Sequence, residues 1–536
     1  MKHVVVVGSG ASGVHFAQTA LEHGARVTML DVWRSGLAPE LPEASFDELK
    51  RSHADPARYF LGTNFEGVLF PGHAGEYYGF PPHKSYVFAG LDRFRSRASG
   101  FAPLTSFARG GLAEAWTGGS FPFNAAEMRD FPVDFAQFAP HYGRIAARIG
   151  INGAEDDLAR FVPVHEHLAP PLELDEHSKL LLERYGSVRE RMRSELRVHW
   201  GRSRGATRSD DRAGRQGCKH LGRCLWGCPR EALYTPSLTL RELRQHAGFT
   251  YRDGVFATRV EADASNRVRA VHVLELASGR SERVEAETLV LAAGTLASAK
   301  LFLDSLRAHG GSAPALAGLM DNRQVLLPFV NLGMLRRRFE PKSYQYHQLA
   351  MGLERDDPRH YVHGLVTTLK TALIHPIVQS VPFDLASALW IFRNAHASLG
   401  LVNVNLHDER RPECRVEIEP DGERSRLVVT YTPSRDEPER MRSALAVVRK
   451  SLSRLGCVVP PGMAHVRPMG ASVHYAGVLP MSAERRPLTT SPICESHDLA
   501  GLFLADGCTF PFLPAKNLTF TLMANADRIA GAVARL

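Results

Sequence analysis

Three closely spaced glycines near the start of the chain could hold the phosphates of a dinucleotide. Gly8, Gly10 and Gly13 follow directly on the β-branched run Val4–Val7, and apolar residues then recur at helical spacing. In such a loop the first glycine permits a tight turn, the second lets the backbone approach a pyrophosphate, and the third lets the helix pack closely on the strand. The helix N-terminus adds free N–H groups that bind phosphate oxygens. This spacing predicts a dinucleotide-binding loop.

A carboxylate at the end of the next strand would complete that site. Residues 26–30 are typical of a second strand, and Asp31 stands at its tip, about 20 residues after the loop. There it can accept hydrogen bonds from ribose hydroxyls. The predicted dinucleotide contacts are Gly8, Gly10, Ala11, Ser12, Gly13 and Asp31. The sequence contains no second loop of this type, which indicates that the electrons come from the substrate itself and not from a nicotinamide.

The carboxy-terminal part of the chain carries a second group of residues that could do chemistry. His474 can accept a proton near neutral pH, because an unperturbed histidine side chain has a pKa of about 6.5. Asn517 precedes a predicted last helix, and its amide can donate and accept hydrogen bonds but cannot take up a proton. Between them an apolar strand over 502–505 ends in Asp506, whose carboxylate could bind a ribose or ribityl hydroxyl.

The order of these residues resembles the carboxy-terminal pattern of the glucose–methanol–choline (GMC) family of FAD-dependent oxidoreductases. That pattern has a His, a Gly three residues later and a Met, followed by a strand ending in Asp, an apolar-Pro turn and an Asn or His before the last helix. This chain supplies His474, Gly477, Met481, Asp506, Pro511 and Asn517. Tyr475 and Val478 stand where Pro and Thr are usual, but neither change removes a functional group that the chemistry needs.

Two further stretches are similar to the same family. Residues 288–298 look like its strand and glycine turn before an apolar helix, and residues 109–119 look like its paired-glycine flavin loop. The resemblance implies FAD contacts at Gly110, Gly111, Trp116, Ala293, Gly294, Asp506, Gly507 and Asn517. A core position for Trp116 is the alternative.

The resemblance implies FAD-dependent oxidation of an alcohol on a sugar, polyol or similarly hydroxylated metabolite. His474 would take the hydroxyl proton while the C–H hydrogen leaves as hydride to flavin N5. Asn517 would orient the alcohol oxygen, and it could also cap the last helix. Two alternatives remain open: a lyase of cyanohydrin type on the same FAD scaffold, and a flavoprotein without catalytic activity. The electron acceptor is not indicated.

Three of the seven cysteines lie close together in the sequence. Cys218, Cys224 and Cys228 are followed by Pro229, a spacing similar to that of iron–sulfur loops. Some dehydrogenases of the family carry a cluster on a similar arrangement. Against a cluster, no fourth cysteine is near in the sequence, and many relatives use a similar segment only as packing beside the flavin. We therefore expect no metal, with a cluster on these three thiols as the less favoured alternative.

The elements that must position these residues are typical of an α/β protein. The chain has 536 residues, of which 44% are hydrophobic and 23% charged, so it can form more than one globular core. We expect a discontinuous Rossmann-like FAD-binding domain and a mixed α+β domain that covers the substrate. The FAD-binding domain is placed at residues 1–324 and 465–536, and the cap at residues 325–464.

Charge and hydropathy limit the partners. The net charge is +8, but acidic residues interrupt the arginine-rich stretch 184–215 and no nucleic-acid-binding motif accompanies it, so we expect no nucleic-acid partner. The short apolar run after Met1 does not resemble a secretory signal, and polar residues interrupt the apolar region 373–406. We expect a cytoplasmic protein without a transmembrane segment. Residues 383–392 are predicted to form a buried helix of the cap, in preference to a lid or a membrane-docking edge.

Overall fold

A parallel sheet lies at the centre of the first structural unit. The structure is a computed structural model that describes residues 2–33, 41–65, 67, 81–212, 214–369, 378 and 382–536. Five strands pair in parallel in the order β22-β11-β1-β2-β7. Their bounds are β1 His3–Val7, β2 Arg26–Leu30, β7 Phe249–Arg252, β11 Leu289–Leu291 and β22 Leu502–Leu504. The first and last thirds of the chain therefore share one sheet.

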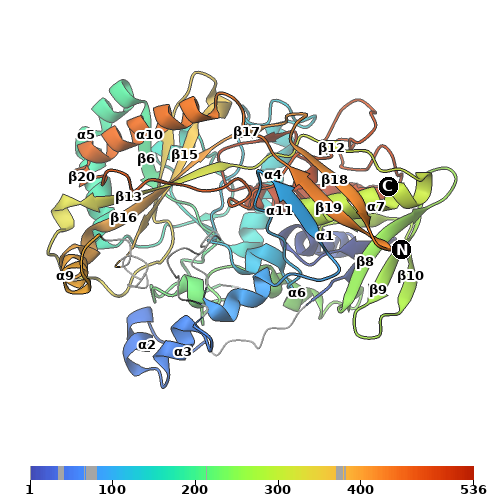
Figure 1. Cartoon of the computed structure of the whole chain (residues 1–536), viewed down its shortest axis with the longest axis horizontal. Helices are drawn as coiled ribbons and strands as arrows, with labels where there is room; N and C mark the ends of the chain where they lie inside the picture. The colour runs from blue at the N-terminus through green and yellow to red at the C-terminus, as the bar shows by residue number, and fades with distance from the viewer. Residues whose placement is uncertain are drawn as a thin grey trace.

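Helices and a second sheet cover the two faces of this sheet (Figure 1). On one face, α1 (Ala11–Glu22) packs against α11 (Thr519–Arg535) and α6 (Pro236–Leu243). On the other face lie α7 (Thr295–Gly310) and an antiparallel sheet of β8 (Val255–Ala262), β9 (Val268–Glu275) and β10 (Ser281–Glu285). Strands buried on both faces explain the apolar runs in β1 and β11. This arrangement confirms the predicted α/β class.

A seven-stranded sheet forms the second unit, at the left of Figure 1. Its order is β20-β13-β16-β15-β14-β6, and β21 also pairs with β13. The bounds are β6 Val198–Arg202, β13 Arg323–Asn331, β14 Leu349–Leu353, β15 Val362–Thr368, β16 Leu399–Leu406, β20 Cys457–Val458 and β21 His465–Val466. The helices α5 (Glu176–Leu196) and α10 (Glu437–Arg454) cover one face through a common apolar core.

The opposite face of this sheet is polar near the carboxy-terminal candidate residues. Because side chains alternate along a strand, Gln324, His363 and Asn405 point away from the core under α5 and α10. Gln324 Nε2 donates to Asn405 Oδ1 at 2.8 Å, and the His363 ring contacts Phe121 at a centroid distance of 4.5 Å. The face thus offers neutral hydrogen-bonding groups.

Strand pairing crosses the domain boundaries that the sequence suggested. β6 comes from within residues 1–324 but belongs to the seven-stranded sheet. Conversely, β18 (Arg415–Asp421) and β19 (Arg424–Thr430) come from residues 325–464 but form a sheet with β3 (Ser96–Ser99) and β12 (Leu316–Ala317). The division at 324/325 and 464/465 stays a prediction.

The remaining elements connect these layers. The helices among them are α2 Phe46–Ser52, α3 Pro56–Leu61 and α4 Phe135–Ile149, and the short strands are β4 Ile151–Asn152, β5 Leu168–Ala169, β17 Asp408–Glu409 and β23 Phe512–Leu513. Two of the short 3-10 helices, η2 Gly111–Glu114 and η8 Gly507–Thr509, include residues of the candidate site. Both chain ends are marked at the right of Figure 1.

The helix expected over residues 383–392 is present as α9 (Leu385–Ala395), but only part of it is buried. Ala388 and Phe392 pack inward, whereas Leu385 and Trp390 are 68% and 63% exposed. The prediction of a buried helix is therefore wrong for its outer face. Residues 370–377 and 379–381 of the same apolar region lie outside the described residues. Among the residues that the structure describes, no helix combines the length and apolar character needed to cross a membrane.

Candidate active site

The glycine loop joins β1 to α1 as its spacing predicted. Gly8 has a φ of +103°, and a Cβ there would lie 2.6 Å from the Ala292 carbonyl oxygen. A Cβ on Gly13 would lie 2.0 Å from the Gly8 carbonyl oxygen, so these two positions need glycine for close packing. A Cβ on Gly10 would meet no protein atom nearer than 4.0 Å. The protein itself therefore does not require glycine at position 10, but a bound molecule that approaches this backbone would.

That space belongs to a cavity of about 540 Å³. Segments that are far apart in the sequence meet around it. Eleven of the predicted contact residues line it: Gly8, Gly10, Ala11, Ser12, Asp31, Gly110, Gly111, Ala293, Gly294, Asp506 and Gly507. Four predicted residues, Gly13, Trp116, His474 and Asn517, are not part of its lining. The volume is within the range of small-molecule and cofactor sites, about 300–1,000 Å³.

Two buried carboxyl groups face this cavity. Asp31 accepts hydrogen bonds from the Ser9 hydroxyl, from Tyr251 Oη at 2.9 Å and from Val32 N at 2.8 Å. Burial raises the pKa of Asp31 to about 6, although these hydrogen bonds act to lower it. Asp506 accepts from the hydroxyl of Ser298 at 2.5 Å, and burial raises its pKa as well. Both groups can accept further hydrogen bonds from the hydroxyls of a ligand.

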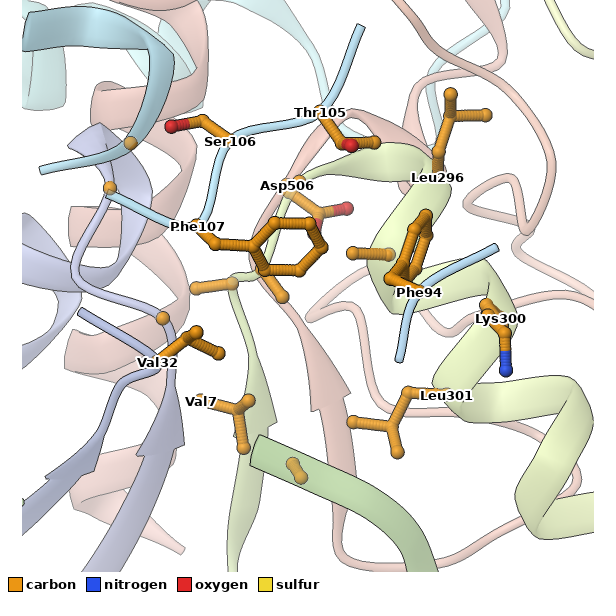
Figure 2. Close-up of a pocket in the computed structure, with 18 of the residues that line it drawn as sticks. Val7, Val32, Phe94, Thr105, Ser106, Phe107, Leu296, Lys300, Leu301 and Asp506 are labelled. Carbon is orange, nitrogen blue, oxygen red and sulfur yellow. The ribbon is translucent and has the colours of Figure 1, made fainter. Parts of the chain in front are cut away.

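Other residues at the cavity were not anticipated from the sequence. Figure 2 shows the rings of Phe94 and Phe107 around the same space as the Asp506 carboxyl group. Their centroids lie 5.2 Å apart. Lys300 also lines the cavity, and its Nζ donates to Asp304 and Ser425 at 2.6 Å each. These residues stand outside any motif, so no spacing in the sequence distinguishes them from core or surface residues.

His474 and Asn517 lie side by side. Asn517 Nδ2 is 3.2 Å from His474 Nε2. His474 is 9% exposed, and burial, followed by the charge of Arg467, lowers the pKa of its imidazole to about 4. The helix α11 begins after Leu518, which is its N-cap, so Asn517 is not positioned as the cap. The amide is therefore directed to the imidazole and not to the helix backbone.

This pair stands next to the cavity. Val473 and Tyr475, on either side of His474, line it, as do Leu518 and Thr519 after Asn517. The hydroxyl of Tyr475 donates to Gly470 O at 2.6 Å and accepts from Leu104 N at 2.9 Å, so it braces the backbone. The structure thus brings an imidazole and a carboxamide to one end of the predicted cofactor site.

Two further residues support the pair and were missed from the sequence. Asn322 Oδ1 lies 2.9 Å from His474 Nδ1. Lys516, directly before Asn517, is fully buried and donates to Glu127 Oε2 at 2.6 Å and to two backbone carbonyls. A lysine beside a candidate catalytic residue was a signal in the sequence, but Asn322 lies far from both motifs along the chain.

Trp116 and the cysteines lie elsewhere. Trp116 packs against Tyr234 and donates from Nε1 to the Tyr234 carbonyl at 2.7 Å, which corresponds to its alternative as a core residue. Cys218, Cys224 and Cys228 pack beside Tyr344 and Tyr346 as free thiols. Burial raises the pKa of Cys218 to about 11 and that of Cys224 well above its usual value, so as free thiols both are protonated at neutral pH.

Comparison with known proteins identifies the relatives of the chain. Residues 411–526 match the family model described as GMC oxidoreductase. The chain is 26% identical over 548 residues to paromamine 6'-oxidase of Streptomyces fradiae, and 23% identical over 553 residues to 6'''-hydroxyparomomycin C oxidase of Streptomyces lividus. Each match covers 99% of this chain and 91% of the relative. Pyridoxine 4-oxidase from Mesorbium loti has a similar fold, with a TM-score of 0.60 at 16% identity over the whole of both chains.

The fold is that of an α/β protein, and the comparisons show the class of an oxidoreductase. The match of residues 411–526 and the two relatives confirm the resemblance to the GMC oxidoreductase family seen in the sequence, and that family implies FAD as the cofactor. These matches favour an alcohol oxidoreductase over the lyase and the non-catalytic flavoprotein. They lend no support to the iron–sulfur alternative at Cys218, Cys224 and Cys228.

Proposed function

We propose that this protein oxidises a hydroxyl group of a sugar-containing compound, with His474 as the base and Asn517 as the residue that orients the hydroxyl. The observation that carries the proposal is the His474–Asn517 pair: the two side chains are 3.2 Å apart, cavity-lining residues stand on both sides of His474, and two more follow Asn517. The relatives that oxidise paromamine and a hydroxyparomomycin support an aminoglycoside or a similar amino sugar as the substrate class.

The cavity has the features that FAD requires. The N-terminus of α1 has no side-chain cap, so its N–H groups are free for a pyrophosphate that approaches Gly10. Asp31 and Asp506 can accept hydrogen bonds from ribose and ribityl hydroxyls. Gly110, Gly111, Ala293 and Gly294 form the adjoining walls. Bound FAD would supply the hydride acceptor.

The remaining chemistry belongs to the residues of the chain. A pKa of about 4 keeps the imidazole of His474 neutral at pH 7, so the ring can accept the hydroxyl proton. Asn517 Nδ2 can exchange its hydrogen bond to the imidazole for one to the substrate oxygen. Orientation of the substrate can lower the barrier by several kcal/mol. A general base typically accelerates the reaction by about 100- to 10,000-fold.

The proposal also gives the seven-stranded sheet a role. We place FAD within residues 1–324 and 465–536 and the substrate-binding cap at residues 325–464. The polar face with Gln324, His363 and Asn405 supports a hydroxylated substrate, because each of these groups is buried and hydrogen-bonds without carrying charge. Burial lowers the pKa of His363 to about 3, which keeps it neutral.

The test is anaerobic mixing of the purified flavoprotein with aminoglycosides, sugars and simple polyols, followed by visible absorbance. We expect at least one amino sugar or sugar to bleach the flavin. His474→Ala should lower the rate of bleaching at least about 100-fold while FAD stays bound, because the base is lost. The control is His246→Ala, an exposed histidine away from the cavity. Wild-type rates in His474→Ala would show that another group is the base, and bound FAD that no alcohol bleaches would favour the non-catalytic alternative.

A further inference from the structure

The side-chain amide of Asn322 has only one orientation that satisfies its surroundings. Asn322 lies directly before β13 and is 1% exposed. Its Nδ2 donates to the carbonyl oxygens of Leu406 and Pro514, both at 2.9 Å. Carbonyl oxygens only accept hydrogen bonds, so a rotated amide would place Oδ1 against two acceptors. The chemistry of its partners therefore directs Oδ1 to the opposite side.

On that side lies the imidazole of His474. Asn322 Oδ1 is 2.9 Å from His474 Nδ1, and because an amide oxygen only accepts, Nδ1 must carry the proton. On the other edge of the ring, Asn517 Nδ2 is 3.2 Å from Nε2, and because an amide nitrogen only donates, Nε2 must accept. Two separate contacts thus require the same neutral tautomer, with the proton on Nδ1 and the lone pair on Nε2.

The neighbouring residue holds the backbone of His474 in the same place. Asp321 accepts hydrogen bonds from Gly470 N at 2.6 Å and from the Ser472 hydroxyl. That hydroxyl in turn accepts from His474 N at 3.0 Å. Asp321 and Asn322, which are 0% and 1% exposed, together anchor both the backbone and the ring of His474. The imidazole therefore has little freedom to turn and exchange its two nitrogens.

We infer that Asn322 is a positioning residue that selects the tautomer of His474 in which Nε2 can act as the base. The inference rests on the proposed function of His474. In the reaction the O–H bond of the alcohol breaks, its proton forms a bond to Nε2, and the electron pair stays on the alcohol oxygen. The Nδ1–H bond to Asn322 persists in the imidazolium, where the positive charge strengthens it. With the proton on Nε2, the ring would have no lone pair on the side of Asn517.

The test is ¹⁵N NMR of the holoenzyme labelled in its histidine rings, with the His474 signals assigned from their loss in His474→Ala. We expect wild-type His474 to have a protonated Nδ1 and an unprotonated Nε2 at pH 7. Asn322→Ala should give a mixture of both tautomers and lower kcat about 10- to 100-fold, with KM and FAD content nearly unchanged, because part of the enzyme lacks a base.

The matched control is Asn331→Ala, at the far end of β13. Asn331 is equally buried and accepts hydrogen bonds from Arg184 and from Gly333 N, but it does not contact His474. We expect this variant to keep the wild-type tautomer and kcat.

The outcomes separate the inference from the proposed function. A protonated Nε2 in wild-type His474 would overturn the role of Asn322, even if His474→Ala abolishes turnover. An unchanged tautomer in Asn322→Ala would overturn it as well. Wild-type turnover in His474→Ala would instead overturn the assignment of the base, whatever the tautomer.

Discussion

At the scale of single residues, the burial of His474 decides over which pH range it can accept a proton. Burial, and after it the charge of Arg467, lowers the pKa of the imidazole to about 4. A lowered pKa favours the neutral ring, so nearly all His474 side chains are unprotonated at neutral pH. An unburied histidine would be partly protonated below about pH 6.5 and would lose activity there.

We therefore expect kcat/KM to rise with pH through about pH 4 and to be constant at higher, near-neutral pH. The reason is that the protonated ring, which dominates below its pKa, has no lone pair. The measurement is the rate of anaerobic flavin reduction against pH, at substrate concentrations well below KM. A loss of activity centred at about pH 6.5 would contradict this prediction, because an unperturbed histidine has that pKa.

A second prediction concerns Gly10. Because a Cβ at this position meets no protein atom nearer than 4.0 Å, Gly10→Val should not disturb the packing of the loop. Its side chain would instead occupy the space of the cofactor, so we expect folded protein that lacks FAD. Flavin content and thermal unfolding measure the two effects. The control is Gly186→Val on α5, where a side chain also finds open space but no cavity, and which should keep its FAD. Fully loaded Gly10→Val protein would refute the loop assignment.

At the scale of elements, a buried ion pair holds the segment that carries Asn517. Lys516 donates to Glu127, to Pro122 O and to Phe161 O, so two other segments, residues 122–127 and the turn at Phe161, converge on one ammonium group just before α11. Both charged side chains are 0% exposed. Burial lowers the pKa of Lys516 and raises that of Glu127, while their attraction opposes both shifts. The ion pair therefore ties the loop before α11 to the rest of the core.

Lys516→Met should lower the free energy of unfolding by about 3–5 kcal/mol, because it leaves the Glu127 charge buried without its partner. Denaturation with urea measures the effect. The double variant Lys516→Met, Glu127→Leu should recover much of the loss, since it removes both charges. As a control, Arg51→Met removes an exposed pair with Asp47 on α2 and should cost less than about 1 kcal/mol. Equal losses in the two single variants would contradict the importance of burial.

At the scale of the whole molecule, one carboxylate joins the beginning and the end of the chain. Asp527 on α11 accepts from Thr19 on α1 at 2.5 Å, and from His141 Nδ1 at 2.6 Å and Arg144 Nε at 2.8 Å on α4. Burial acts to raise its pKa, but these hydrogen bonds outweigh burial and hold the pKa well below its usual range. The group therefore stabilises the folded protein only while it is ionised.

A pKa below the unfolded value of about 3.9 means that the unfolded chain binds the proton first as the pH falls. The contribution of Asp527 is thus complete at neutral pH and is lost as the pH falls through about 4 and below. We expect Asp527→Asn to lower the free energy of unfolding by about 1.5–3 kcal/mol at pH 7. The difference from the wild type, measured with urea, should shrink below about pH 4. A difference that stays constant with pH would refute the ionised state.

Local patterns made part of this architecture predictable. β1, the glycine loop, α1 and β2 follow one another along the chain, so their spacing was enough to predict the loop and Asp31. β6 is different, because it is separated by more than a hundred residues from the rest of its sheet, and no periodicity shows which edge it will join. The exposed face of α9 was missed for a related reason: an apolar run indicates a helix, but not which neighbours will cover it.

The sequence by itself determined the chemical groups: a glycine loop before a helix, two carboxylates at strand ends, an imidazole and a carboxamide, in an order that resembles one enzyme family. Only the tertiary structure decided how they act together. It brought Asn322, more than a hundred residues away, against one nitrogen of His474 and Asn517 against the other. Proton affinity and tautomer depend on burial and on the direction of neighbouring donors and acceptors. Those are properties of contacts between distant segments, and residue types and spacing alone do not specify them.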